Sequence, residues 1–109
     1  MGLTFEQLRQ ADVARCESVW HMCDDWTPTD WACAAAGELG EACNLIKKLR
    51  RGEEIPLVGI AHELADTVIY LDLLAARLRI DLGEAIREKF NLVSARVGSA
   101  ITLQEERLL

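Results

Sequence analysis

Residues 35–70 read AAGELGEACNLIKKLRRGEEIPLVGIAHELADTVIY, and this stretch decides the fold. It contains two helical patterns, separated by a break between Gly52 and Pro56. Each pattern carries two acids three residues apart, a spacing that places both on one helix face. The four acids are Glu38, Glu41, Glu63 and Asp66. The stretch therefore predicts a helical hairpin with one acid pair on each arm.

The faces that carry these acids are otherwise apolar. The first stripe also holds Trp31, Ala34, Leu45 and Leu49, and the second holds Gly59, Ile60, Tyr70 and Leu74. Carboxylates on an apolar face destabilise a fold unless something neutralises them. No run of Lys or Arg shares these stripes, and a hard divalent cation prefers carboxylate oxygen. The pattern indicates a metal site inside a helical bundle.

The positions of the two acid pairs along their helices are compatible with such a site. About ten residues, roughly 15 Å of helix, separate Glu41 from the end of its arm. About seven residues, roughly 10 Å, separate Pro56 from Glu63. Because the arms are similar in length and the connection is short, antiparallel packing would bring the four acids near one level.

Capping signals extend the helical pattern in both directions. Thr4 with Gln7, Thr27 before Pro28, and Asp81 with Glu84 each resemble a helix start. The expected helices run from Thr4 to about Cys23, from Pro28 to about Arg51, from Pro56 to about Arg79, and from Asp81 to about Val97. Asp12 falls inside the apolar stripe of the first helix, and no alternating strand pattern is present. The predicted class is an all-α four-helix bundle.

The third expected helix is apolar on nearly every side. Its apolar residues are Leu57, Val58, Ile60, Leu64, Val68, Ile69, Leu71, Leu73 and Leu74. A helix of this kind is buried on more than one side. In a chain of this size, the pattern predicts that a partner subunit covers part of it, so that the protein oligomerises through apolar helix faces.

Composition limits the remaining choices. A chain of 109 residues with 50% hydrophobic content is expected to form one domain spanning 1–109. The net charge of −6 argues against nucleic acid or an anionic membrane as partner. Four cysteines without a C-x-x-C pair favour reduced thiols in a cytoplasmic protein. Glu6 and Arg9 interrupt any signal-like run, and no uncharged stretch is long enough to span a bilayer.

The chemistry of the acids points to phosphate. An all-oxygen cluster suits Mg²⁺ or Mn²⁺ better than Zn²⁺, and four carboxylates can hold two or more ions. Paired ions bind phosphate oxygens and lower the pKa of a bound water. The reaction class this favours is hydrolysis of a phosphate anhydride. A zincin reading of His62-Glu63 lacks its second histidine, and neither histidine supplies a di-iron Glu-x-x-His pair.

Several segments together resemble a known family. They are Ala36-Gly37-Glu38-Leu39-Gly40-Glu41, Glu63-Leu64-Ala65-Asp66-Thr67-Val68-Ile69-Tyr70, Ile80-Asp81-Leu82-Gly83-Glu84-Ala85, Lys89-Phe90-Asn91 and Ser94-Ala95-Arg96-Val97-Gly98-Ser99. Across about 27–103 the chain resembles the MazG-like nucleotide pyrophosphohydrolases of the all-α NTP pyrophosphatase superfamily. The resemblance implies a dimer or a dimer of dimers. It also implies Mg²⁺-dependent cleavage of a nucleoside triphosphate to the monophosphate and pyrophosphate.

The resemblance also assigns roles to individual residues. The two acid pairs would be metal ligands and catalytic residues. Lys89, Asn91 and Arg96 would lie near the phosphates, either in their own subunit's site or in that of a neighbouring subunit. The expected substrate contacts are Trp31, Asn44 and Tyr70. Alternatively, Trp31 is an aromatic residue of the core and Asn44 is an amide on the helix surface.

One position departs from the family pattern. Some relatives carry a Glu directly before the first motif Glu, and here that position is Gly37. A motif Glu or a metal-bound hydroxide would then serve as base. Two other functions stay open at this point: a non-catalytic helical oligomerisation module, and a related activity such as dUTP or phosphoribosyl-ATP hydrolysis. The sequence does not determine which nucleobase is preferred or what the C-terminal tail does.

Overall fold

The computed structural model describes residues 2–104, which form four α-helices and one short 3₁₀ helix. The elements are α1 (Phe5–Val19), η1 (Cys23–Asp25), α2 (Pro28–Arg50), α3 (Leu57–Arg77) and α4 (Leu82–Val97). Within these residues there is no strand, so the all-α prediction with four helices is confirmed. The end of the C-terminal tail, 105–109, lies outside the described residues.

The predicted capping signals begin the helices as expected. Thr4 and Thr27 each form a reciprocal capping box, with Gln7 and Asp30 respectively. The Asp81 side chain accepts from the backbone N–H of Glu84 at 3.0 Å. These bonds satisfy N–H groups that have no partner within their own helix. At the end of α4, Gly98 takes a left-handed conformation with φ 77°, which glycine adopts without steric cost.

The end of the first helix differs from the prediction. The stripe expected to continue to Cys23 is broken, because α1 ends at Val19. The backbone N–H groups of Trp20 and His21 both bond to the carbonyl of Cys16, which closes the last turn and redirects the chain. As a result the Trp20 side chain is 62% exposed, and Cys23 reaches the core from η1 instead.

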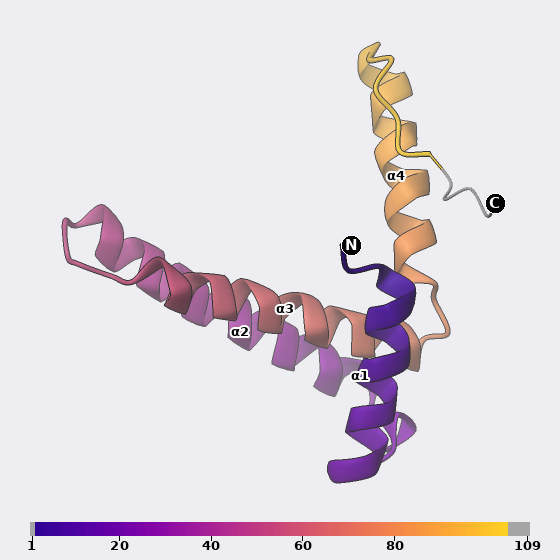
Figure 1. Cartoon of the computed structure of the whole chain (residues 1–109), viewed down its shortest axis with the longest axis horizontal. Coiled ribbons are helices and arrows are strands. Elements are labelled where there is room, and N and C mark those ends of the chain that lie inside the picture. Colours follow the sequence, from indigo (N-terminus) through magenta and orange to yellow (C-terminus); the bar gives the residue numbers. More distant parts are fainter. Residues whose placement is uncertain (1, 105–109) are drawn as a thin grey trace.

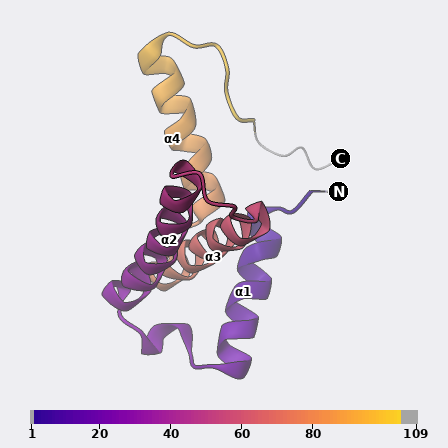
Figure 2. The ribbon, with the colours of Figure 1, turned by 90° about the vertical axis from the view of Figure 1, so that its left-hand side faces the viewer.

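Helices α2 and α3 form a long antiparallel hairpin, and α1 packs across the C-terminal part of α3 (Figures 1 and 2). The main buried cluster lies where these helices and η1 meet. It consists of Cys16, Cys23, Trp31, Leu73 and Ala76. Partly buried Trp26 and Tyr70 pack against this cluster. The hairpin therefore holds the acidic residues, and α1 with η1 closes one end of it.

Helix α4 touches α1 but stands away from the α2–α3 hairpin (Figure 1). The radius of gyration is 16.5 Å, whereas a compact domain of this length has about 13 Å. Within the described residues, no helix is both long and apolar enough to cross a membrane. The extended shape leaves much apolar surface on α3 and α4 exposed.

Candidate metal centre

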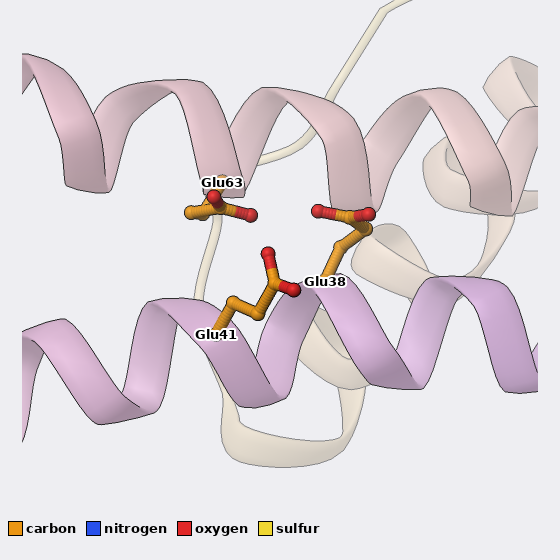
Figure 3. A group of neighbouring side chains, drawn as sticks. All are labelled: Glu38, Glu41 and Glu63. Carbon is orange, nitrogen blue, oxygen red and sulfur yellow. The ribbon is translucent and has the colours of Figure 1, made fainter.

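Three of the four predicted acids meet between α2 and α3. Glu38 and Glu41 project from α2 toward Glu63 on α3 (Figure 3). One carboxylate oxygen from each residue lies within 4.8 Å of the other two. The antiparallel hairpin creates this meeting point, because it places residues 38–41 opposite residue 63.

The Glu63 carboxylate is the most perturbed member of the cluster. The pKa of Glu63 is raised to about 7. The largest cause is the nearby Glu38 carboxyl, followed by burial of Glu63 and by the neighbouring Glu41. Its Oε2 atom is buried and has no hydrogen-bond partner among the described residues. Three carboxylates that crowd together repel one another unless a proton or a cation lies between them.

The donor set fits a hard divalent cation. All three groups offer oxygen, and Glu63 also has a buried oxygen without a hydrogen-bond partner among the described residues. Carboxylate oxygens are the protein ligands that Mg²⁺ and Mn²⁺ prefer. Glu38 and Glu63 are half-buried while Glu41 is exposed, so one side of the cluster is open to solvent.

Asp66 lies outside the group of three. It is exposed on α3, one turn after Glu63. Its charge still contributes, together with Glu38, to raising the pKa of Tyr70, for which burial is the larger cause. Its predicted role as a fourth ligand stays a prediction.

An aromatic cluster borders the hairpin near the acids. Trp31 lies 4.5 Å from Trp26 and 6.2 Å from Tyr70, measured between ring centroids. Trp31 is 2% exposed, and its Nε1–H donates to the Cys23 carbonyl at 3.0 Å. Trp31 is therefore a core residue whose polar atom is already used, whereas Tyr70 is half-buried.

Two members of this cluster were not recognised in the sequence. His21 stacks on Trp26 with ring centroids 5.0 Å apart, and its Nδ1 lies 2.8 Å from the Met22 carbonyl oxygen. Both residues fall in the segment between α1 and α2, which carries no helical period. The only signal available was the local density of aromatic residues between 20 and 31.

The remaining predicted substrate contacts lie on two different helices: Asn44 is one turn after Glu41 on α2, and Lys89 and Arg96 are on α4. Asn44 is exposed on α2, and Lys89 and Arg96 are exposed on α4. Because α4 stands away from the hairpin, its basic residues are separated from the cluster in this chain (Figure 1). Their predicted contact with phosphate stays a prediction.

Asn91 is engaged elsewhere in the described structure. Its Nδ2 donates to the Leu103 carbonyl at 3.0 Å, and its Oδ1 accepts from the Leu103 N–H at 2.8 Å. The side chain thus fastens the segment after α4 back onto the helix. Asn91 would have to release Leu103 before its amide could donate to a phosphate.

The position before the first motif acid is open. A Cβ placed on Gly37 would meet no atom within 4 Å, apart from its own helix backbone. The absence of a carboxylate there is therefore not imposed by packing in this chain.

Fold and site together define an all-helical protein with a carboxylate cluster suited to a divalent cation. The chain is similar to dCTP pyrophosphatase 1 of Homo sapiens, with 29% identity over 107 residues. The alignment covers 88% of this chain and 63% of the human protein, so the chain spans less than two thirds of that relative's length. No family model matches the sequence, and no solved structure matches it.

Proposed function

We propose that this protein is a Mg²⁺-dependent nucleoside triphosphate pyrophosphohydrolase that converts a deoxynucleoside or nucleoside triphosphate to the monophosphate and pyrophosphate. The observation that carries the proposal is the convergence of Glu38, Glu41 and Glu63 within 4.8 Å. The similarity to a dCTP pyrophosphatase supports the reaction class. It also makes dCTP the first substrate to test.

Glu38, Glu41 and Glu63 would hold the cations, with Asp66 completing the set from the next turn of α3. When bound, Mg²⁺ or Mn²⁺ offsets charge on the phosphate oxygens and lowers the pKa of the attacking water. In the metal-free chain the pKa of Glu63 is raised to about 7, so a cation that binds there would displace a proton near neutral pH. The open side of the cluster at Glu41 is where a triphosphate would approach.

The aromatic cluster would border the nucleoside. Tyr70 is half-buried, is influenced electrostatically by Glu38 and Asp66, and has its ring 6.2 Å from that of Trp31, so it would link the acids to the aromatic cluster. A nucleobase stacks well on aromatic rings. Trp31 would act chiefly as the buried support of this surface, because its N–H is already bonded.

The protein would act as a homodimer or a dimer of dimers. An exposed apolar stripe runs along α3 to its C-cap at helical spacing, formed by Leu57, Leu64, Val68, Leu71 and the C-cap residue Leu78. A further apolar groove on α4 is lined chiefly by Ile86, Phe90, Val93, Val97 and Ile101. Surfaces of this kind mark protein–protein contacts. In such an assembly, Lys89 and Arg96 of one subunit would serve the phosphates bound by another.

The test is a panel of deoxynucleoside and nucleoside triphosphates, including dCTP and dUTP, with Mg²⁺ or Mn²⁺. Monophosphate and pyrophosphate are measured together. Glu63→Gln keeps the shape but removes a charged ligand, so activity should fall by orders of magnitude with the helical circular dichroism unchanged. Glu54→Gln, an exposed acid in the loop after α2, is the matched control and should keep full activity.

Two outcomes would contradict the proposal. Release of orthophosphate and a nucleoside diphosphate would show that cleavage occurs at another phosphorus. A chain that binds no Mg²⁺ by calorimetry and hydrolyses no member of the panel would instead be the non-catalytic oligomerisation module.

A further inference from the structure

Two buried carboxyl groups face each other between α1 and α3, away from the candidate metal centre. Asp12 on α1 is 3% exposed and Asp72 on α3 is 1% exposed. Both oxygens of Asp12 and the Oδ2 atom of Asp72 have no hydrogen-bond donor among the described residues. Buried carboxylates without donors are strongly destabilising, so this arrangement requires an explanation.

One cation lies at bonding distance from the pair. The Nε of Arg9 donates to Oδ1 of Asp72 at 3.0 Å, and the Nη2 of Arg9 donates to the Ile80 carbonyl at 2.8 Å. Arg9 therefore favours negative charge on Asp72. Because the Arg9 guanidinium bonds to Asp72, the buried carboxyl of Asp12 is left without a partner among the described residues.

Other ionisable groups face the pair from each neighbouring element. Asp12 is influenced by Arg9 and Arg15 of α1 as well as by Asp72. Asp12 in turn influences Cys16 on its own helix and Tyr70 on α3. The cleft beside Asp72 also carries Glu6, Glu17, Asp24, Arg79 and Asp81. Arg79 is bonded to Asp24 in this cleft, so it does not neutralise Asp12.

We infer that Asp12 and Asp72 share one proton, carried by Asp12, and that this carboxyl–carboxylate hydrogen bond is a proton-dependent latch that fastens α1 onto α3. The two groups lie close enough for a side-chain hydrogen bond, which can form only if one of them is protonated. One proton thus supplies the missing donor. Because Arg9 donates a hydrogen bond to Asp72, the remaining negative charge lies on Asp72.

The latch has a structural consequence beyond its own two helices. Cys16, one turn after Asp12, packs in the same buried cluster as Trp31 and Leu73. Helix α1 therefore supports the aromatic residues that border the acid cluster. Asp12 is a positioning residue in this sense, and the inference does not depend on the proposed function.

The direction of the pH dependence follows from burial. Burial first, and then the proximity of Asp72, raise the pKa of Asp12 to about 7. The protonated Asp12 carboxyl therefore adds to the free energy of unfolding. This contribution is fully present below the pKa of an unfolded Asp, about 3.9, and is lost as pH rises through about 7. Above that range two buried carboxylates repel each other, and α1 should loosen from α3.

The direct test is carbon-13 NMR of the aspartate carboxyl groups in the full-length, metal-free protein between pH 4 and 9. The Asp12 carboxyl should stay protonated at pH 5 and titrate near 7. A fully ionised Asp12 at pH 5 would overturn the inference. This measurement uses the unmodified chain, so it decides the question even if a variant fails to fold.

Variants provide a second readout through the melting temperature. In Asp12→Asn the amide donates to Asp72 at every pH, so the melting temperature of the variant minus that of the parent should grow by several degrees between pH 5 and pH 8. Asp12→Ala removes the bond and should melt below the parent at pH 5. Asp25→Asn, an exposed aspartate on η1, is the matched control and should show a constant difference. A constant difference for Asp12→Asn would contradict the latch.

Discussion

Glu38 and Glu63 lie 25 positions apart in the sequence, yet one carboxylate oxygen of each lies within 4.8 Å of the other across the α2–α3 hairpin. Proximity to Glu38 is the largest cause that raises the pKa of Glu63. Two acids in this arrangement respond both to protons and to cations. The first two predictions follow from this relationship.

Divalent metal should stabilise the fold. A ligand that binds only the native state at 100 times its Kd adds about 2.7 kcal/mol to the free energy of unfolding. Calorimetric melting with saturating Mg²⁺ or Mn²⁺ should therefore show a higher Tm than melting with chelator. Glu63→Gln should lose most of this increase, while Glu54→Gln should retain it. An unchanged Tm in the parent protein would rule out a metal site at these carboxylates.

Metal affinity should weaken as pH falls. Because the pKa of Glu63 is raised to about 7, a proton occupies this carboxyl below that pH and must leave before a cation can bind. Isothermal titration with Mg²⁺ should give a larger Kd at pH 6 than at pH 8, together with proton release that depends on the buffer. Equal affinities at the two pH values would contradict the raised pKa.

The exposed stripe on α3 should hold subunits together. A stable interface buries about 800 Å² per partner, and a charge in its apolar core is strongly unfavourable. Val68→Glu or Leu71→Glu should shift the protein toward monomer in light scattering and reduce activity. Val19→Glu, at an exposed apolar position at the end of α1, is the control and should leave the assembly intact. A parent protein that is monomeric and active at micromolar concentration would defeat this prediction.

The segment after α4 should loosen when Asn91 is removed. Its side chain makes two hydrogen bonds with the backbone of Leu103, each worth about 0.5–1.5 kcal/mol. In Asn91→Ala, the Leu103 amide should exchange with deuterium about ten-fold faster or more, with little change in global stability. Asn44→Ala, which removes an exposed amide from α2, should leave this exchange rate unaltered.

Local sequence determined the four helices and most of their ends. Thr4, Thr27 and Asp81 supply side-chain acceptors for unsatisfied N–H groups, and Gly98 permits the left-handed end of α4. The acid spacing also placed Glu38 and Glu41 on one face. These features depend on residues within one or two turns, so a single sequence contains the information.

Only the tertiary structure decided which acids meet and where the other polar groups lie. It joined Glu63 to the α2 pair and left Asp66 exposed outside the three, a distinction that equal i, i+3 spacing could not make. It ended α1 at Val19 and paired Asp12 with Asp72, 60 positions away. Crossing and height of packed helices set these distances. These distances arise from contacts between segments that are far apart in the sequence. A local hydrophobic period shows which face of a helix is buried, but not how two helices pack against each other.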